Sequence, residues 1–315
     1  MKLRFGARGS ALAKWQTYHV AERLRALLPG VEVEQIEITS KGDRIQDVPL
    51  SHVEGTGFFT AAIQEVLLRR EIDVAVHSYK DLPVEPVKGL VVAAVPARGP
   101  MEDVLCAREG MTLIDLPPGA RIGTCSARRT AQIRLVRDDL EIVSLRGNVP
   151  TRLARVGADL DAIVLARAGL LRLGLESAIT EIFRVETMLP APAQGALAIE
   201  CRSADDAVRE CLRVLNDAET ERSVAAERSM LHALGGGCSV PVGASACVVS
   251  GRIHLSAGVF GLATRRAARV NVVGGDPVGV GELAAARLLD AGASAILGEF
   301  NSPAADWTPR LEVRA

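Results

Sequence analysis

The stretch 72–83, IDVAVHSYKDLP, decides the fold, because a run of apolar residues ends there in a cluster of polar ones. Its first half, IDVAV, is typical of a strand buried on both faces. Lys80 and Asp81 follow directly. Residues just past the carboxyl end of a strand in an α/β sheet face the crevice where ligands bind. The stretch therefore indicates either a functional site or a surface ion pair in a loop, and on its own it leaves both open.

The residues before this strand predict the rest of an α/β unit. Residues 3–6 and 31–38 have strand patterns, and a helix is expected from Ser10 onward and another over 60–70, an order typical of a parallel sheet. Arg8 and the N-cap candidate Ser10 lie at the first strand-to-helix turn, where free N–H groups and the helix dipole attract anions. The polar, glycine-rich stretch 39–59 predicts a functional loop.

A second α/β unit follows a hinge after Pro96. Its predicted strands, 121–123, 141–144 and 161–165, are each followed by a loop or a helix start that holds Ser, Thr, Asn or Arg. Because successive strand ends share one rim of a sheet, their guanidinium groups are expected to converge and to bind carboxylates or phosphates. A small polyanion is the implied ligand. The arginines concerned are Arg128, Arg129, Arg146, Arg152 and Arg172.

The last third of the chain predicts a return to the first unit and then a small α+β domain. Residues 190–195 form a second crossing, so we expect two lobes with a cleft between them. Helices then lead to Cys238, whose thiol is expected to be accessible because three glycines precede it. The expected domains are 1–97 plus 196–216 (α/β), 98–195 (α/β), 217–302 (α+β) and a tail at 303–315.

Composition excludes several classes of protein. A net charge of −1 and 3% aromatic residues argue against a nucleic-acid partner. No apolar run reaches the about 20 residues that cross a bilayer, and the start lacks the apolar core of a signal peptide, so we expect no membrane partner and a cytoplasmic location. The six cysteines include no C-x-x-C pair and the histidines show no ligand spacing, so no metal is expected.

Nearly the whole chain resembles one known family. The shared motifs occur in order along the sequence: ARGSALAKWQ at 7–16, GD at 42–43, VHSYKDLP at 76–83, GTCSARR at 123–129, SLRGNVPTRL at 144–153, AGLLRLGL at 168–175, APAQGALAIECR at 191–202 and AERSMLHALGGGCSVPVG at 226–243. On these motifs the sequence resembles the porphobilinogen deaminases, also called hydroxymethylbilane synthases.

The resemblance implies a transferase of haem biosynthesis. Such an enzyme condenses four molecules of porphobilinogen, a small polycarboxylate pyrrole, head to tail with loss of ammonia, and it frees hydroxymethylbilane by hydrolysis. The resemblance also implies two lobes like periplasmic binding proteins, a small α+β C-terminal domain, and a dipyrromethane cofactor joined by a thioether to Cys238. Asp81 is the implied catalytic carboxylate. The implied cofactor- and substrate-binding residues are Arg8, Ser10, Asp43, Lys80, Thr124, Ser126, Arg128, Arg129, Arg146, Arg152, Arg172 and Gln194.

The residue types suit this chemistry. Loss of ammonia from an aminomethyl pyrrole leaves a delocalised cation, which the fixed carboxylate of Asp81 is suited to stabilise. A thiolate such as that of Cys238 is a good nucleophile for the same electrophile. His52 and Thr56 stand where many family members have lysines, so no binding role is assigned to either. His77 is interpreted as a structural neighbour of Asp81 rather than a proton carrier.

Two other classes of protein remain open on the residues alone. A non-catalytic, two-lobed anion-binding module would need the same arginines, but it would gain nothing from a carboxylate in its site. A metal-dependent enzyme is the weaker of the two. The expected oligomeric state is a monomer.

Overall fold

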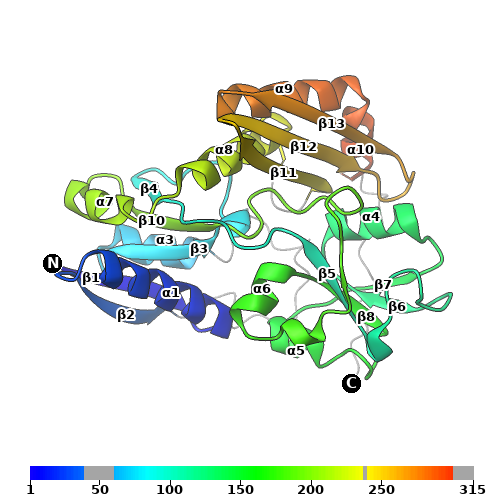
Figure 1. Cartoon of the computed structure of the whole chain (residues 1–315), viewed down its shortest axis with the longest axis horizontal. Coiled ribbons are helices and arrows are strands. Elements are labelled where there is room, and N and C mark those ends of the chain that lie inside the picture. The colour runs from blue at the N-terminus through cyan, green and yellow to red at the C-terminus, as the bar shows by residue number, and fades with distance from the viewer. Residues whose placement is uncertain (39–59, 237–239, 301–315) are drawn as a thin grey trace.

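A computed structural model describes residues 1–38, 60–236 and 240–300 of the chain, and these residues form three sheets (Figure 1). Two five-stranded sheets are the centres of lobe 1 and lobe 2, and a three-stranded sheet is the centre of a third unit. In Figure 1 lobe 1 is mainly blue and cyan, lobe 2 is green, and the third unit is orange and lies above both. The α/β class with two lobes and a small C-terminal α+β unit is thereby confirmed.

Lobe 1 has the strand order β2-β1-β3-β10-β4. The first three strands are parallel, as the sequence predicted, but β10 runs antiparallel to both of its neighbours. The reason is that β10 returns from lobe 2 and enters the sheet at the end where β3 leaves it. The elements are β1 (Lys2–Arg8), α1 (Ala11–Leu27), β2 (Glu32–Ile38), α3 (Ala61–Leu68), β3 (Val74–Ser78), η2 (Tyr79–Asp81), β4 (Leu90–Ala94), β10 (Leu197–Arg202) and α7 (Asp206–Arg213).

Strand β3 is buried on both faces, as its composition predicted. Val74 and Val76 pack into a cluster that includes residues of α1 and α7. Ala75 packs on the other side, against Ile63 and Leu67 of α3. Since β3 is fixed on both faces, the short helical turn η2 that follows it has a defined place at the edge of the sheet.

Lobe 2 repeats this plan with the order β7-β6-β8-β5-β9, in which β6, β7 and β8 are parallel and β5 is antiparallel to β8. Strand β5 was not predicted, because its first residue, Asp103, belongs to a segment interpreted as a hinge. Ser126 and Asn148 cap the helices that follow β6 and β7. The elements are β5 (Asp103–Ala107), β6 (Arg121–Gly123), α4 (Ala127–Val136), β7 (Glu141–Val143), α5 (Val149–Leu153), β8 (Ala162–Ala166), α6 (Arg167–Arg172) and β9 (Glu181–Ile182), with the short turns η3 (Arg108–Gly110) and η4 (Glu176–Ala178).

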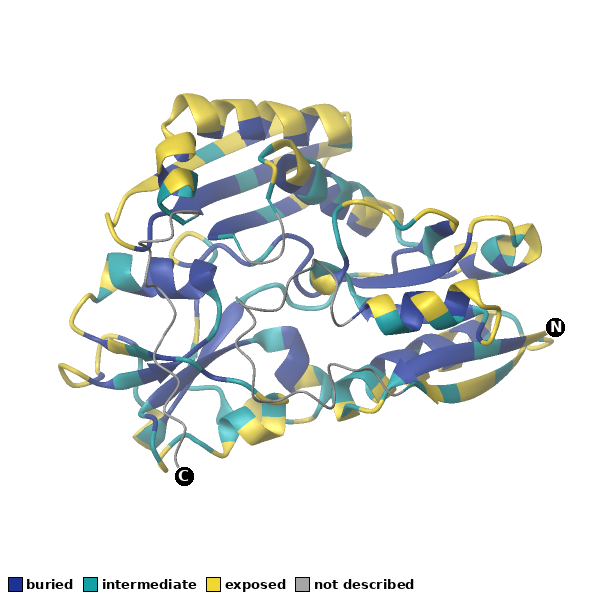
Figure 2. Cartoon of the chain, turned by 180° about the vertical axis from the view of Figure 1, so that it is seen from behind, coloured by how far each residue is buried: buried dark blue, intermediate teal, exposed yellow. Residues whose placement is uncertain are grey.

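The third unit is an antiparallel sheet covered by helices, as predicted. One apolar cluster joins α8 and α9 to the inner face of the sheet, and the outward side of α9 is exposed (Figure 2). Helix α10 was not predicted. The elements are α8 (Ala218–Ala233), β11 (Val242–Val249), β12 (Arg252–Phe260), β13 (Ala267–Gly274), α9 (Pro277–Asp290) and α10 (Ala293–Phe300).

Glu227 of α8 holds both crossings between the lobes. Its carboxylate is fully buried, and it accepts two hydrogen bonds from the Arg98 guanidinium, at 2.7 and 2.9 Å. It also accepts from the N–H groups of Ala193, at 2.6 Å, and Ala246, at 2.7 Å. Arg98 lies on the first crossing and Ala193 on the second, so the third unit fixes the path of the chain between the lobes.

None of the helices in the described part of the chain is long and apolar enough to span a membrane.

Candidate active site

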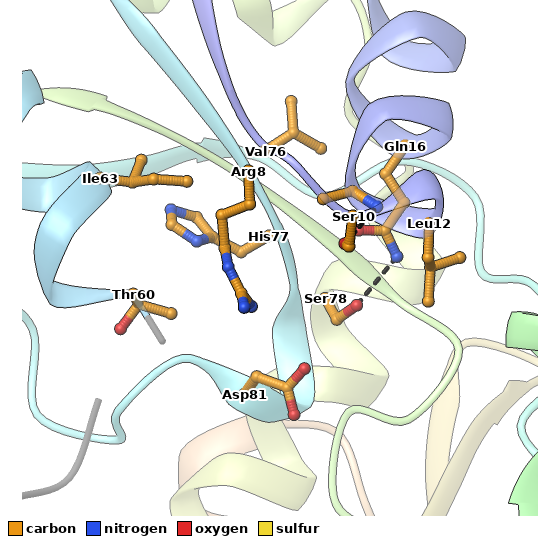
Figure 3. Close-up of a pocket in the computed structure, with 11 residues that line it drawn as sticks. Arg8, Ser10, Leu12, Gln16, Thr60, Ile63, Val76, His77, Ser78 and Asp81 are labelled. Atoms are coloured by element: carbon orange, nitrogen blue, oxygen red, sulfur yellow. Dashed lines mark hydrogen bonds between the residues drawn. The ribbon is translucent and has the colours of Figure 1, made fainter. Parts of the chain in front are cut away.

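A pocket lies at the carboxyl ends of β1 and β3 in lobe 1 (Figure 3). Three residues predicted for the site, Arg8, Ser10 and Asp81, line it together. Figure 3 shows Arg8 pointing from β1 toward the turn that carries Asp81. The pocket is also lined by residues that were not predicted for it, including Gln16, Thr60 and Ser78.

The local structure explains why these groups meet. The Ser10 side chain accepts a hydrogen bond from the N–H of Ala13, so it is the N-cap of α1 as predicted, an interaction that contributes about 1 kcal/mol. The positive end of the α1 dipole therefore faces the pocket, where it favours negative charge. The Gln16 amide donates to the Ser78 hydroxyl at 2.8 Å and ties α1 to the end of β3.

The turn η2 presents Lys80 and Asp81, and Arg228 of α8 holds it in place. The Arg228 guanidinium donates to the carbonyl oxygens of Leu82, at 3.0 Å, and Pro83, at 2.5 Å, and it lies 4.5 Å from the Tyr79 ring centroid. The Asp81 side chain remains exposed at the pocket. The helix that leads toward Cys238 thus fixes the turn that carries the predicted catalytic carboxylate.

Lys80 is the link between the two lobes. Its ammonium group donates to the Gln194 Oε1 at 3.2 Å, and the Gln194 amide donates in turn to the Asp103 carboxylate of lobe 2 at 3.0 Å. Burial lowers the pKa of Lys80 to about 8, an effect that Asp81 opposes. Burial therefore disfavours the charged form of Lys80, and an anionic ligand beside it would stabilise that form.

Asp103 organises the arginines at the start of α4. Its carboxylate accepts from Arg128 at 2.6 Å and from Arg129 at 2.7 and 3.0 Å, and all three residues are buried. Although burial opposes ionisation, the two guanidinium groups hold the pKa of Asp103 far below its usual range. Arg128 and Arg129 are therefore held by an internal carboxylate, which the sequence did not predict.

The remaining predicted arginines lie on nearby elements of lobe 2. One side-chain nitrogen of Arg146, Nη2, is buried and has no hydrogen-bond partner among the described residues. Arg152 donates to the Gly147 carbonyl at 2.7 Å, and burial lowers its pKa while the charge of Asp81 opposes this. Arg172 donates to the Gly195 carbonyl at 2.6 Å, and burial lowers its pKa to about 10.

The other predicted residues fall into two groups. Thr124 is buried and accepts a hydrogen bond from the N–H of Ser126, which is the N-cap of α4. Asp43 and Cys238 lie outside the described residues, as do His52 and Thr56. Among the described residues, no group of three or more His, Cys, Asp or Glu side chains is arranged to hold a metal ion.

Sequence reasoning missed Asp103, and one signal was available. The acidic residue directly precedes the apolar run Val104–Ala107, which is the same transition from charge to buried strand seen at Asp73. A strand that returns antiparallel brings its first residue to the carboxyl ends of its parallel neighbours. Without knowledge of the strand direction, Asp103 has no place near the arginines.

Together, the fold and the site define a two-lobed α/β protein with an exposed carboxylate in one lobe and a cluster of arginines in the other. Residues 3–210 match a family model described as porphobilinogen deaminase, dipyromethane cofactor binding domain, and residues 222–290 match the porphobilinogen deaminase C-terminal domain. The chain belongs to the porphobilinogen deaminase family.

Similar proteins carry the same name. A porphobilinogen deaminase from Brevibacillus brevis is 44% identical over 300 residues, which cover 95% of this chain and 97% of that one. One from Syntrophotalea carbinolica is 49% identical over 247 residues, 78% of each chain. Among solved structures, the alignment with the methionine-binding protein MetQ covers 72% of this chain and 94% of that one, at 12% identity and a TM-score of 0.45.

Proposed function

We propose that this chain condenses four porphobilinogen molecules head to tail, with loss of ammonia at each step, and releases hydroxymethylbilane for haem biosynthesis. The observation that carries the proposal is the meeting of two kinds of group. Asp81 stands exposed at the end of β3, and the Lys80–Gln194–Asp103 chain connects its turn to the arginines of lobe 2. The Asp81 carboxylate suits a reaction centre that becomes cationic. The arginines of lobe 2 suit a ligand with several carboxylates.

The catalytic role proposed for Asp81 follows from where charge develops. When the C–N bond of the aminomethyl pyrrole breaks, ammonia leaves and positive charge spreads over the ring. A carboxylate fixed beside the ring stabilises that charge and accepts a hydrogen bond from the pyrrole N–H. The hydrogen bonds from Arg228 to Leu82 and Pro83 hold the backbone after the turn, which favours a fixed position of Asp81 during the reaction.

The substrate-binding role is assigned to the cations that surround Asp81. Arg8 and the N-terminus of α1, with its cap Ser10, would bind carboxylates from the lobe 1 side. From the lobe 2 side Arg152 and Arg172 would do so. Arg128 and Arg129 already share the Asp103 carboxylate, so together they retain a net positive charge for a ligand.

The described residues also fit the dipyrromethane cofactor of the family. Among the described residues, Nη2 of Arg146 is buried and has no hydrogen-bond partner. A carboxylate of the cofactor would supply that partner. When bound, the cofactor supplies a covalently held pyrrole end from which the product grows. We propose that Cys238 carries it and that Arg146, Thr124, Ser126 and Asp43 help to hold it.

The proposal includes the organisation of the protein. We propose the domain division 1–97 plus 196–216, 98–195 and 217–302, which limited proteolysis at the two crossings would test. A monomer and a cytoplasmic location remain predictions from the sequence. Size-exclusion chromatography with light scattering checks the first, and cell fractionation checks the second.

Intact mass spectrometry tests the cofactor and separates an enzyme from a binding module. The freshly purified protein should carry the added mass of two linked pyrroles, and Cys238→Ser should lack it. Cys125→Ser is the matched control, because Cys125 lies in the lobe 2 site loop and its loss should leave the added mass in place. An unmodified mass in active protein would contradict the cofactor assignment.

Asp81→Asn tests the reaction itself. The variant should fold and keep the added mass, but hydroxymethylbilane formation should fall by a factor of about 100 or more, because the neutral amide does not stabilise a cation. Glu85→Gln is the control, since Glu85 is an exposed carboxylate in the same segment that pairs with His232. Near-normal turnover in Asp81→Asn would remove Asp81 from the mechanism.

A further inference from the structure

A buried carboxylate lies directly behind the pocket. Glu200 of β10 is 3% exposed, and its Oε2 lies 3.0 Å from Nε2 of His77, which lines the pocket and is 5% exposed. The Gln64 amide of α3 donates to the same carboxylate at 3.0 and 3.2 Å. His77 forms part of the pocket wall, whereas Glu200 and Gln64 are not among the residues that line it.

The partners of His77 assign the proton of its neutral ring to one nitrogen by inference. The Gln64 amide donates to both Glu200 oxygens, as it does to an ionised carboxylate, which only accepts hydrogen bonds. The Nε2 of His77 must then be the donor in its contact with Glu200. In the neutral imidazole this leaves Nδ1 with a lone pair. In this arrangement Glu200 accepts the hydrogen bond from Nε2 of His77, and Nδ1 is the nitrogen that can accept a proton.

The charges around His77 come from three elements. Glu200 of β10 contacts the ring, and Asp81 of η2 and Arg8 of β1 line the same pocket. Of the described residues on the helices packed on β3, those named at this site are uncharged: Thr60 and Gln64 at the start of α3, and Ser10 and Gln16 at the start of α1.

We propose that His77 accepts the proton that a pyrrole ring loses in each coupling, and that Glu200 is the positioning residue behind it. This inference rests on the proposed function. In the step, the C–N bond of one pyrrole breaks and its electron pair leaves with ammonia. The free α-carbon of the other pyrrole forms the new C–C bond to the vacated carbon. The C–H bond at that α-carbon then breaks, its electrons restore the ring, and the proton moves to Nδ1 of His77.

Separate residues for charge stabilisation and for proton acceptance allow both to occur in one site. Asp81 must remain anionic while positive charge is present, and a proton on Asp81 would cancel that role. His77 is a neutral acceptor until the proton arrives, and Glu200 then faces an imidazolium instead of an imidazole. The sequence alone favoured a purely structural His77, because the partner lies 123 positions away on β10.

The pH dependence of kcat for hydroxymethylbilane formation tests the proposal. We expect His77→Gln to lower kcat by a factor of about 100 or more and to reduce the decline of activity at acid pH without abolishing it, because no base remains at this position while Asp81 must still be ionised. In Glu200→Gln the decline should move to lower pH, since a neutral amide stabilises the imidazolium less. The KM should change little in both variants.

His232→Gln is the matched control. His232 also pairs with a glutamate, Glu85, at 2.6 Å, but both side chains are exposed and lie outside the pocket. Its pH profile should match that of the wild type. Intact mass should show that every variant carries the cofactor. In ¹⁵N NMR of the wild type, His77 should show the proton on Nε2, independently of any activity.

The measurements distinguish failure of the proposed function from failure of the role proposed for His77. A wild type that forms no hydroxymethylbilane overturns the proposed function. If the wild type is active and the acid decline is the same in Glu200→Gln, His77 is not the proton acceptor. That measurement decides the matter even if His77→Gln does not fold. A proton found on Nδ1 in the NMR spectrum also overturns the proposal.

Discussion

Asp73 and Asp103 each bind two arginines, but they lie at opposite ends of the parallel strands of their sheets. Asp73 of lobe 1 accepts hydrogen bonds from Arg4, at 2.9 and 3.0 Å, and from Arg202, at 2.9 Å. Asp103 of lobe 2 accepts from Arg128 and Arg129. Asp73 precedes β3 and lies at the amino end of the parallel strands. Asp103 starts the antiparallel strand β5 and lies at their carboxyl end, on the side of the site.

The charge balance of the two clusters differs accordingly. Around Asp73, the hydrogen-bonded groups are two cations, Arg4 and Arg202, and two carboxylates, because Asp205 also accepts from Arg202. The exposed Arg70 adds only a looser ion pair to Asp205, at 3.5 Å. Around Asp103, two guanidinium groups share one carboxylate, and Lys80 joins through Gln194. In a balanced cluster, the charges neutralise one another within the protein. An unbalanced one holds cations in place while leaving part of their charge for a ligand.

Asp103→Asn should have the largest effect, because it breaks the cluster that serves the site. Removal of the charge leaves two buried guanidinium groups without an anion, which costs about 3–5 kcal/mol of the free energy of unfolding. The KM for porphobilinogen should also rise, by about tenfold, since the arginines lose their fixed directions. Urea unfolding and steady-state kinetics measure the two effects. An unchanged KM in the folded variant would place Asp103 with Asp73, as a structural group.

Asp73→Asn should lower stability alone. The pKa of Asp73 is about 2, below its ordinary value of 3.8, because Arg4 and Arg202 donate to it against the effect of burial. The ionised form therefore stabilises the fold by about 2 kcal/mol above pH 3.8, and this contribution is lost as pH falls toward 2. Urea unfolding at several pH values should show a flatter acid dependence in the variant. A marked fall in kcat per folded molecule would contradict the comparison.

The smallest effect is expected at Lys80, which joins the Asp103 cluster, through Gln194, to the turn that carries Asp81. With a pKa of about 8, Lys80 loses its charge above that pH, and KM should rise severalfold between about pH 7 and 9. The pKa of Lys80 in the folded protein lies below its ordinary value of 10.5, so folding releases a proton between pH 8 and 10.5 and stability rises with pH there. Lys80→Arg should remove the rise in KM, and an equally steep rise in that variant would exclude Lys80 as its source.

Much of the fold was predictable from local pattern. The apolar run before Lys80 predicted a strand buried on both faces, and Ser10 was identified correctly as a helix cap. These features depend on neighbours in sequence. The antiparallel β5 and β10 were not recognised as such, because strand direction is set by long connections between lobes and not by the residues of the strand.

The site divides in the same way. Arg8, Ser10 and Asp81 were predicted from strand ends and do line one pocket. Asp103 and Glu200 escaped, since each reaches the site through an antiparallel strand and finds its partners far along the chain. Asp103 lies in a segment interpreted as a hinge, and Glu200 lies in an apolar run. Neither sequence context identifies the groups that these carboxylates contact.

The Glu227 carboxylate makes the three units depend on one another during folding. Its four hydrogen bonds come from the first crossing, the second crossing and β11. A buried carboxylate that lacks any of these donors bears an uncompensated desolvation cost. A partly folded chain in which one unit has detached is therefore disfavoured relative to both end states. The molecule should unfold in a single cooperative transition despite its three separate sheets.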